Sequence, residues 1–477
     1  MKIIILGAGQ VGASVAESLV SEENDITIVD TDSARLAHLQ DRLDLRAVVG
    51  NAAWPSVLRD AGADDADLLI AVTQSDQTNL VACKVAKSIF NLPTRIARLR
   101  SGDFLSNEVL LSEENFAVDF ALCPEEIVTD YIAKLVEFPE ALQVVEFAGG
   151  RVTLVGVRAY EGGLLVGKPI SSMREHFPIG IEARIPAIFR NGQPLTPDGD
   201  TLIENGDEVF LLAATEVIRP ALRELRRMQK PVQRLMLAGG GNIGQRVAAC
   251  LQKRYEVKII EQSPVRAEHL ASVLTNTLVL AGDATDEELL EQENIAEMDM
   301  FLSLTNDDED NIMAATLAKR LGCKRVVALI NRRAYADMVQ GGPIDIGLSP
   351  AQVSIGTLLA HVRRGDVAGV HSLRRGAAEA LELVAHGDTK TSKVVGKTVG
   401  EIDWPKGVTV AAIVRHLDQQ QIIGVSDEGT SIRRYGEVVI AHHDTRIEPE
   451  DHVIVFCVRK KLVRRVEKLF QVGFGFL

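Results

Sequence analysis

Two glycine-rich stretches of this chain have the residue types and spacing that can hold a phosphate group. Residues 6–12 have the sequence LGAGQVG and residues 238–244 have AGGGNIG. In a turn of this kind the first glycine permits the tight bend, the second lets the backbone approach a pyrophosphate, and the third lets a helix pack closely on a strand. The phosphates would lie at the positive end of the following helix. The glycines concerned are Gly7, Gly9 and Gly12 in the first stretch and Gly239, Gly241 and Gly244 in the second.

A carboxylate ends the next apolar segment after each turn. Asp30 ends ITIVD and Glu261 ends VKIIE, at the distance from the glycines where a carboxylate accepts hydrogen bonds from a ribose diol. A 2′-phosphate would be repelled there, so the residues favour NAD(H) or an adenine nucleotide over NADP(H). The alternative is a nucleotide-type fold that has lost its ligand, but two intact sets of residues favour binding.

The two predicted sites differ in charge. Arg98 follows a strand-like segment of the first copy, where its side chain can reach a phosphate. When Arg95 is aligned with Arg325, Ala328 takes the matching place in the second copy. We therefore expect the first site to prefer the more anionic ligands, such as ATP or ADP.

The second copy is also more acidic. TQSDQTN at 73–79 corresponds to TNDDEDN at 305–311, and GNA at 50–52 corresponds to GDA at 282–284. The acids suggest either a divalent cation or, as we favour, acidic residues at a helix N-terminus, where the helix dipole stabilises them.

One register relates the two halves of the chain. The following residues recur 232 positions later: Gly12 as Gly244, Gly50 as Gly282, Asp67 as Asp299, Thr73 as Thr305, Asp76 as Asp308 and Asn79 as Asn311. The copying continues further, since VGKPI at 166–170 recurs as VGKTV at 395–399. The chain is therefore a tandem duplication with the order A-B-A′-B′, in which A is a large α/β unit and B is a small one.

Each large unit alternates short apolar segments with helix-length segments. In the first they are KIIIL, DITIVD, RAVVG, DLLIAVT and TRIARL. Fully apolar strands that alternate with helices predict a parallel sheet covered on both faces. Amphipathic helices are predicted to begin at Pro124 and Pro350, and their wide apolar faces must pack on the sheet or on another subunit.

The small units carry short alternating strands and turn sequences, which predicts an α+β architecture. In the second small unit 32 residues separate Arg415 from Glu448, whereas 13 separate Arg190 from Glu204 in the first. The excess is polar with interspersed glycine, so we predict a surface loop or an extra hairpin. A charged segment at 223–234 joins the halves, and we interpret it as a solvated helix.

Composition disfavours several classes of function. The net charge of −14 argues against nucleic acid, whose phosphates need a basic face. Five cysteines are scattered without a CxxC pair, as in a reducing compartment without disulfides or a zinc site. The opening MKIIILGAG predicts a first strand rather than a targeting segment, and no run approaches the ~18 apolar residues of a membrane span. We expect a cytosolic protein.

No catalytic group accompanies the predicted sites. A dehydrogenase needs a general acid or base beside its substrate, and we identify no catalytic His/Asp or Lys/Tyr constellation in either small unit. HGD at 386–388 and AHHD at 441–444 are absent from the first copy, and we interpret their histidines as surface residues. A GxxxxGK[ST] loop for ATP hydrolysis is also missing. The residues favour a sensor over an enzyme.

The whole chain, from MKIIILGAGQVG through LMLAGGGNIG to VEKLF, resembles the TrkA family, the peripheral regulatory subunits of bacterial Trk potassium-uptake systems. The most specific elements are the tandem order, both glycine turns with Asp30 and Glu261, and GDA at 282–284. The resemblance implies two RCK domains, each a Rossmann-like parallel-sheet N-lobe followed by a small α+β C-lobe. The expected bounds are 1–122 and 141–225 for the first domain, and 231–348 and 369–466 for the second.

The resemblance also implies ligands and partners. Family members bind NAD(H) and ATP or ADP, without catalysis. They lie on the cytoplasmic face of the inner membrane as a ring, here expected to be a homotetramer, beneath an integral membrane potassium transporter of the TrkH or TrkG type. The helices beginning at Pro124 and Pro350 would lie at subunit contacts. By position, the nucleotide-binding residues are Gly7, Ala8, Gly9, Gln10, Val11, Gly12, Asp30, Thr73, Gln74 and Arg98 in the first site, and Gly239, Gly240, Gly241, Asn242, Ile243, Gly244, Glu261 and Thr305 in the second.

Two other classes of function remain open. An NAD-dependent oxidoreductase is one, and the missing catalytic group counts against it. The regulatory subunit of a potassium channel or efflux system is the other, because it uses the same domain. The tandem duplication favours the uptake system.

Overall fold

The computed structural model divides into two compact units, which are described separately. One contains Met1–Ala133 and Gln233–Leu358, and the other contains Lys134–Val232 and Leu359–Leu477. The structure describes residues 1–20, 24–160, 163, 165–177, 181–223, 230–332, 335, 339, 342–362, 367–425 and 431–472. Half of the charged segment predicted as a solvated helix, residues 224–229, lies outside the described residues.

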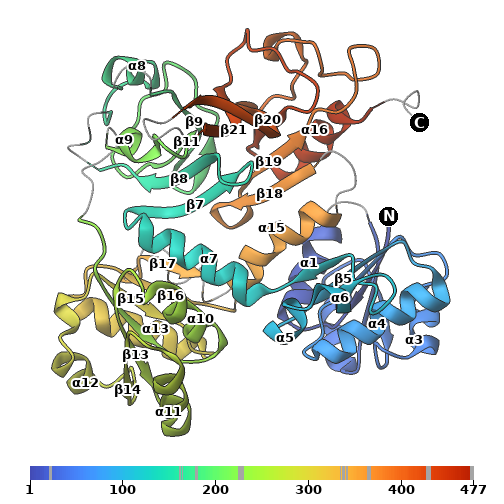
Figure 1. The fold of residues 1–477 in the computed structure, drawn as a ribbon, viewed down its shortest axis with the longest axis vertical. Helices are drawn as coiled ribbons and strands as arrows, with labels where there is room; N and C mark the ends of the chain where they lie inside the picture. The colour runs from blue at the N-terminus through green and yellow to red at the C-terminus, as the bar shows by residue number, and fades with distance from the viewer. Residues whose placement is uncertain are drawn as a thin grey trace. The chain divides into compact units, whose positions relative to one another are not determined.

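The first unit contains two six-stranded parallel sheets (Figure 1). The first sheet has the order β3-β2-β1-β4-β5-β6. Its strands are β1 (Lys2–Leu6), β2 (Asp25–Asp30), β3 (Arg46–Val49), β4 (Leu68–Ala71), β5 (Thr94–Arg98) and β6 (Phe120–Leu122), and its helices are α1 (Gln10–Val20), α2 (Ser33–Gln40), α3 (Pro55–Asp60), α4 (Asp76–Phe90), α5 (Gly102–Leu105) and α6 (Glu108–Leu111).

The second sheet repeats this topology in the order β14-β13-β12-β15-β16-β17. Its strands are β12 (Arg234–Ala238), β13 (Glu256–Glu261), β14 (Thr277–Ala281), β15 (Met300–Ser303), β16 (Val326–Leu329) and β17 (Ile346–Leu348), and its helices are α10 (Asn242–Leu251), α11 (Pro264–Val273), α12 (Glu287–Gln292), η2 (Ile295–Glu297) and α13 (Asp308–Arg320). The prediction of two parallel sheets is confirmed. In both, the strand order reverses beside the first strand, where α/β sheets bind ligands.

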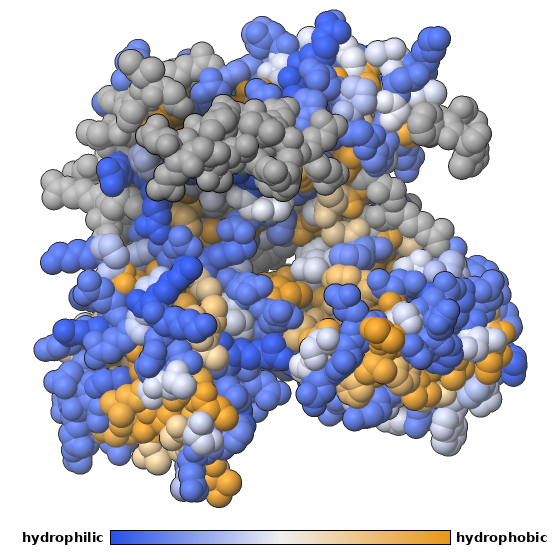
Figure 2. Space-filling view, viewed as in Figure 1, coloured by the Kyte–Doolittle hydropathy of each residue, from blue (hydrophilic) through white to orange (hydrophobic). Residues whose placement is uncertain are grey.

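The central strands of both sheets are almost wholly buried. All four residues of β4, β15 and β16 are buried, because helices cover both faces of a parallel sheet. Exposed large apolar side chains remain on both lobes, and Figure 2 shows apolar patches on the parts that carry them.

A long helix follows each parallel sheet. These helices are α7 (Pro124–Glu137) and α15 (Pro350–Val362), as predicted from the two prolines. Val128 and Ile132 of α7 are fully buried within the chain. A role of either helix at subunit contacts stays a prediction.

The second unit contains two five-stranded antiparallel sheets, in the orders β10-β9-β11-β8-β7 and β18-β19-β22-β20-β21. Buried side chains of both sheets, Phe189 and Phe456 among them, belong to one apolar cluster. The elements are β7 (Ala141–Phe147), β8 (Val152–Arg158), η1 (Ile170–Ser172), α8 (Met173–His176), β9 (Ala183–Arg190), β10 (Gln193–Leu195), β11 (Glu208–Ala214) and α9 (Ile218–Leu222), then β18 (Val367–Leu373), η3 (Arg374–Gly376), β19 (Ala378–Val384), η4 (Val399–Glu401), β20 (Val408–Val425), β21 (Ser431–Ile440), β22 (His452–Cys457), η5 (Lys460–Leu462) and α16 (Val463–Phe470). The predicted α+β lobes are confirmed.

The excess residues of the second small sheet lengthen a hairpin. Strands β20 and β21 pair antiparallel from Ala412–Ile440 outward to Val425–Ser431, and residues 426–430 lie outside the described residues. The first copy has the shorter equivalent, β9 paired with β10, so the described excess residues lengthen an existing hairpin and do not form the surface loop or the additional hairpin that we predicted. No helix in the described part of the chain combines the length and apolarity needed to cross a membrane.

Candidate functional site

The first glycine turn has the backbone geometry that a phosphate-binding turn requires. Gly7 has a φ of +105°, which side-chain-bearing residues rarely adopt. A Cβ on Gly12 would lie 1.9 Å from the carbonyl oxygen of Gly7, so no larger residue fits between α1 and β1. A Cβ on Gly9 would meet no atom within 4 Å. The second glycine therefore faces open space, as close approach of a ligand demands.

The second turn repeats these features. Gly239 has a φ of +95°, and a Cβ on Gly244 would lie 1.9 Å from the Gly239 carbonyl oxygen. Gly241 again faces open space. One difference is that a Cβ on Gly240 would lie 2.1 Å from Leu270, whereas the first copy accommodates Ala8. The second turn is therefore packed more tightly by α11.

Both predicted ribose-binding carboxylates lie against their glycine turns. Asp30 Oδ2 accepts a hydrogen bond from the Ala8 N–H at 2.6 Å, and Oδ1 accepts from Asp32 N–H at 2.9 Å. Glu261 does the same, with Oε2 accepting from Gly240 N–H at 2.7 Å. An ionised carboxylate has about four acceptor positions, so each group retains capacity for a ribose diol. The carboxylates thus brace the turn and face the same place as the phosphate-binding backbone.

Thr73 is held by a buried asparagine that we did not single out as a site residue. The Thr73 hydroxyl donates to Asn79 Oδ1 at 2.6 Å, and Asn79 Nδ2 donates to the carbonyl of Arg98 at 2.8 Å. Asn79 has no exposed surface and so ties the carboxyl ends of β4 and β5 together. Its recurrence in the duplication was the available signal.

Arg98 is paired with a carboxylate rather than open to solvent. Its Nη2 donates to Glu125 Oε1 of α7 at 3.1 Å, and the two side chains are 14% and 11% exposed. Burial lowers the pKa of the guanidinium, while Glu125 opposes that shift. The Arg98 Nε is buried and makes no hydrogen bond. This orphaned donor is a position where an anionic ligand can be accepted.

The second copy lacks an arginine at this position, but the matching residue is not Ala328. Asn311 Nδ2 donates to the carbonyl of Leu329 at 2.9 Å, as Asn79 does to Arg98. Leu329 is therefore the counterpart of Arg98, and our alignment is wrong by one residue. The alignment was anchored on two arginines near the strand start, whereas hydrogen bonds between strands set the register. Because α7 and α15 both begin with proline, Ala351 stands where Glu125 stands in the first copy.

The remaining predicted residues lie at the carboxyl-terminal ends of the parallel sheets. Thr305 donates from its hydroxyl to Asn311 Oδ1 at 2.8 Å, as Thr73 does in the first copy. Exposed positions are Gln10, Gln74 and Asn242, and half-buried ones are Val11 and Ile243. All 18 predicted residues thus fall at the carboxyl ends of strands or the first turns of helices, 10 in one sheet and 8 in the other.

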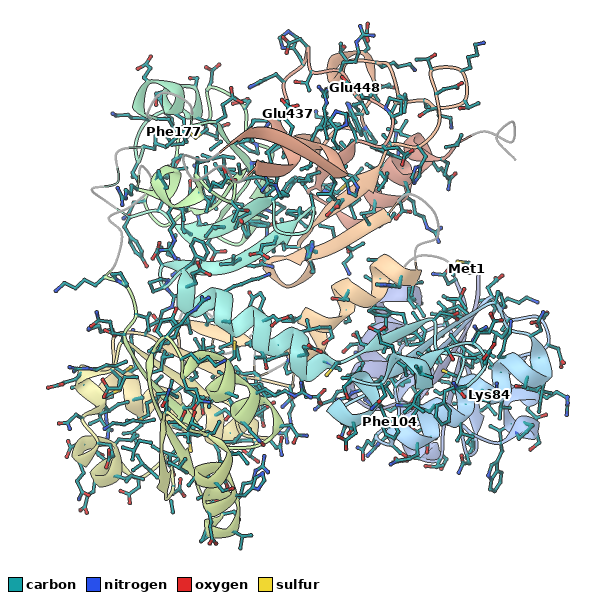
Figure 3. The ribbon with its side chains drawn as sticks, in the orientation of Figure 1. Met1, Lys84, Phe104, Phe177, Glu437 and Glu448 are labelled. Carbon is teal, nitrogen blue, oxygen red and sulfur yellow. The ribbon has the colours of Figure 1, made fainter. Side chains whose placement is uncertain are left out.

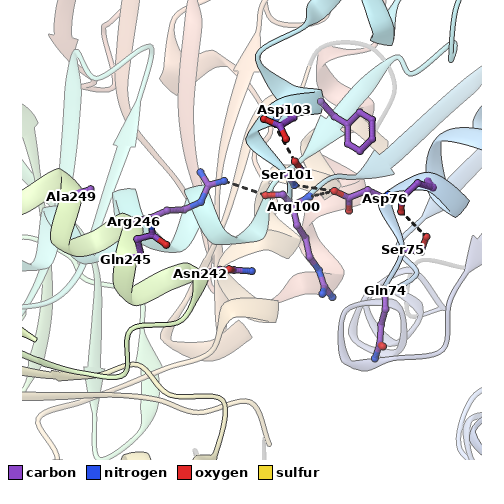
Figure 4. Close-up of a pocket in the computed structure, with 12 residues that line it drawn as sticks. Gln74, Ser75, Asp76, Arg100, Ser101, Asp103, Asn242, Gln245, Arg246 and Ala249 are labelled. Carbon is purple, nitrogen blue, oxygen red and sulfur yellow. Dashed lines mark hydrogen bonds between the residues drawn. The ribbon is translucent and has the colours of Figure 1, made fainter. Parts of the chain in front are cut away.

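A cavity of about 770 Å³ lies beside Gln74 (Figure 4). Arg100 and Arg246 line it, and Arg246 Nη2 donates to the Arg100 carbonyl at 3.2 Å. Phe104 of α5, labelled in Figure 3, also lines it. Asp76 and Asp103 line the same cavity, so its two arginines are accompanied by two carboxylates. Sequence reasoning missed both arginines, because they come from lobes far apart in the chain.

The acids of 305–311 act within the protein. Asp307 is the N-cap of α13 and accepts from Asp310 N–H, and Asp308 accepts from the backbone of Asn331 and Arg332. In the described part of the chain no three His, Cys, Asp or Glu side chains form a group able to hold a metal ion. The arrangement supports the helix N-terminus interpretation.

An arginine lies across the second glycine turn. Arg266 Nε donates to the Gly240 carbonyl at 2.9 Å, and its Nη2 donates to Gln245 Oε1 at 2.6 Å. In the first copy Arg35 pairs with Asp32, the N-cap of α2, at 3.1 Å. The two sites therefore also differ here, because Arg266 is hydrogen-bonded across the second glycine turn, whereas Arg35 of the first copy pairs with Asp32 instead.

Comparisons with known proteins agree with this duplicated geometry. The TrkA-N domain model matches residues 3–116 and 235–350, and the TrkA-C domain model matches residues 154–226 and 388–471. The chain is 52% identical over 476 residues to the Trk system potassium uptake protein TrkA of Halomonas elongata. It is 53% identical over 478 residues to the protein of that name from Vibrio alginolyticus, and in both cases 100% of each chain is covered.

Solved structures support the fold. The GsuK channel matches with a TM-score of 0.60 and 18% identity, covering 98% of this chain and 78% of that one. The GsuK channel bound to NAD matches with a TM-score of 0.59 at the same identity and coverage. Since both domain models match twice and the curated relatives match over their full length, the chain belongs to the TrkA family.

Proposed function

We propose that this chain is the nucleotide-sensing regulatory subunit of a Trk potassium-uptake system. The observation that carries the proposal is that both glycine turns keep a positive-φ glycine, an open second glycine and a bracing carboxylate. A fold that had lost its ligand would have no reason to keep an open glycine twice. We assign the subunit to the Trk system because the curated relatives are named Trk system potassium uptake proteins.

The proposed ligands are NAD(H) and ATP or ADP, bound by the 18 residues predicted from the sequence. A solved structure of similar fold is a channel bound to NAD. The first site, with the unsatisfied Nε of Arg98, suits the more anionic ligands. The second site, with Leu329 and a tight turn, suits a dinucleotide of lower charge.

The proposed partner is an integral membrane potassium transporter of the TrkH or TrkG type. In the proposal a homotetrameric ring of this chain lies at the cytoplasmic face of the inner membrane. It binds nucleotide without converting it, so the chemistry is recognition and the output is a change in transporter gating. The domains would act as two N-lobes at 1–122 and 231–348 and two C-lobes at 141–225 and 369–466.

The energy needed for gating is within reach of such a ring. A ligand shifts an equilibrium only through its different affinity for two states, and a tenfold preference corresponds to about 1.4 kcal/mol per site. Four equivalent sites that act together supply roughly 5.6 kcal/mol, close to the ~5.5 kcal/mol that carries a population from 1:99 to 99:1. A modest preference at each site therefore suffices.

Helix α7 gives the ligand a route to the rest of the chain. Its first turn holds Glu125 against Arg98, and the same helix continues to Glu137, past the boundary between the units at Lys134. A ligand phosphate that attracts Arg98 competes with Glu125 for the guanidinium. Exchange of ATP for ADP or of NADH for NAD then changes the strength of the ion pair between Arg98 and Glu125 at the start of α7.

Calorimetric titration of the full chain with NADH, NAD, ATP and ADP tests the proposal. We expect saturable binding, no change in nucleotide absorbance on standing, and an ATP affinity at least tenfold lower in Arg98→Ala. Leu329→Ala, at the equivalent position of the second copy, is the matched control and should leave ATP binding at the first site unchanged. Failure of all four nucleotides to bind the unmodified chain would overturn the proposed function.

A further inference from the structure

Trp54 occupies a helix N-cap without capping the helix. It precedes α3 with an extended backbone, its side chain makes no capping hydrogen bond, and it is 60% exposed. The second copy has Asp286 at this place, and the carboxylate there accepts from Glu288 and Leu289 N–H. Asp stabilises an N-cap far better than an aromatic residue does. The first copy thus forgoes local stability to expose a large ring, and positions that break a local rule in this way tend to be functional.

The two positions are structurally equivalent. Gly50 N–H donates to the Asp30 carbonyl at 2.9 Å, and Gly282 N–H donates to the Glu261 carbonyl at 3.0 Å. Trp54 is the fourth residue after Gly50, and Asp286 is the fourth after Gly282. Trp54 therefore lies on the β3–α3 loop, which begins beside the predicted ribose-binding carboxylate.

A second exposed apolar residue lies next to the predicted ribose-binding carboxylate, on the neighbouring strand. Val49 is the register partner of Asp30 and is 60% exposed. In the second copy Ala281 is the register partner of Glu261. The first site therefore has a valine and a tryptophan where the second has an alanine and an aspartate.

Strand order indicates which part of a ligand reaches Trp54. The phosphates lie at the turn after β1, and the adenosine ribose lies at the carboxylate that ends β2. The strand beyond β2 is β3. A nucleotide laid across the strands in this order carries its base past the ribose and toward the β3–α3 loop.

We propose that Trp54 stacks on the adenine ring of the nucleotide in the first site, with Val49 contacting the base beside the ribose. Aromatic side chains bind bases through their π-faces without needing a hydrogen-bond pattern. The first site then differs from the second in base recognition as well as in phosphate recognition. This inference rests on the proposed function, because it names one contact of that site.

Fluorescence can report the contact directly, since the chain has two tryptophans. The other, Trp404, belongs to the second unit and donates from its Nε1 to the Val399 carbonyl at 2.9 Å. In Trp404→Phe the emission comes from Trp54 alone. We expect ATP and ADP to quench it along a saturating curve whose midpoint is the calorimetric Kd, and NADH to quench it further by energy transfer.

Substitution in the otherwise unmodified chain gives a second readout that does not depend on Trp404→Phe folding. Trp54→Ala should weaken ATP and NAD binding about tenfold, which corresponds to about 1.4 kcal/mol, and Trp54→Phe should retain most of the affinity. Trp54→Asp copies the second lobe, so it should raise the melting temperature of this unit while weakening binding as much as Trp54→Ala. Ile89→Ala, another exposed apolar side chain of the lobe at 51%, is the matched control.

The outcomes separate this inference from the proposed function. Unchanged nucleotide affinity in Trp54→Ala, or unchanged Trp54 emission at saturating ATP, overturns the stacking contact and leaves the proposed function standing. Unchanged affinity with a smaller assembly by light scattering would assign Trp54 to a subunit interface and also overturn it. Absence of binding to the unmodified chain overturns the proposed function itself.

Discussion

The guanidinium of Arg98 lies 3.1 Å from the carboxylate of Glu125, and both residues are replaced together in the second copy. The equivalent positions there hold Leu329 and Ala351. An ion pair that ties β5 to the first turn of α7 in one lobe is thus absent from the other. This pair is therefore one electrostatic difference between the two sites, and the arginine across the second glycine turn, Arg266, is another.

Removal of the Glu125 charge should strengthen ATP binding at the first site. In Glu125→Gln the guanidinium of Arg98 no longer has a carboxylate partner at 3.1 Å, so a ligand phosphate meets less competition. We expect ATP affinity to rise about tenfold, which corresponds to about 1.4 kcal/mol, and NAD affinity to rise less. Titration calorimetry measures both. Glu126→Gln, at the exposed neighbouring position, is the control, and weaker ATP binding in Glu125→Gln would contradict the competition.

Substitutions of Arg98 and Glu125 should have non-additive effects on the free energy of unfolding. Arg98→Leu leaves the mostly buried Glu125 with Arg100 at 3.8 Å and the Cys123 thiol at 4.0 Å, and should cost roughly 1–3 kcal/mol because a buried charge loses its nearest charged partner. Arg98→Leu with Glu125→Ala reproduces the second copy, so most of the loss should be recovered. Urea denaturation followed by circular dichroism gives the double-mutant cycle. Additive losses from the two changes would show that the residues are not coupled.

Arg266 should restrain the second glycine turn. It bridges the Gly240 carbonyl and Gln245, and a ligand that approaches the turn must accommodate or displace it. We expect Arg266→Ala to raise NAD affinity several-fold at the second site, because the bridge no longer has to open. Arg35→Ala is the control in the first copy, where the arginine pairs with Asp32 instead. Equal effects of the two substitutions would mean that the bridge has no role in binding.

The contribution of His371 to the stability of the second unit should be lost as the pH drops below 6.5, whereas Asp451, whose pKa burial raises to about 6, acts in the opposite direction. Burial lowers the pKa of His371 to about 4, Glu382 opposes the shift, and Lys134 adds to it. Between pH 6.5 and about 4 the unfolded chain binds a proton on this imidazole that the folded chain does not bind, so stability decreases with falling pH in that window. Glu382, whose pKa is lowered, contributes its own loss only below its ordinary pKa of about 4.5.

The measurement is the melting temperature of His371→Phe and of the unmodified chain at pH 7 and pH 5. His371 packs edge-on against Phe147 with ring centroids 5.0 Å apart, so a phenyl ring keeps the packing and removes the titration. The variant should lose less stability between the two pH values. An identical loss in both proteins would assign the pH dependence to other groups.

The glycine turns illustrate what local sequence can predict. A positive φ at Gly7 and the close approach at Gly12 depend on residues a few positions apart, and the carboxylate of Asp30 follows at the end of the very next strand. Such constraints lie within one βαβ unit of roughly 30 residues. For the same reason the recurrence of the pattern after 232 positions predicted a second site.

Strand register and long-range side-chain partners could not be predicted from such local patterns. Leu329, not Ala328, matches Arg98 because the buried Asn311 and the neighbouring strand decide the pairing. Glu125 meets Arg98 across 27 positions of sequence, and Arg246 reaches the Arg100 carbonyl across 146. No local pattern specifies which side chains meet at such distances.

The sequence by itself determined the duplication, the two parallel sheets, the small antiparallel lobes and the carboxylate beside each glycine turn. These follow from backbone sterics and from the alternation of apolar segments, both of which act between residues close in the chain. Only the tertiary structure decided that Arg98 is held by α7, that Arg266 lies over the second turn and that two lobes share an arginine-lined cavity. These relationships depend on how separate helices and strands pack, and packing brings together side chains that the chain itself keeps far apart.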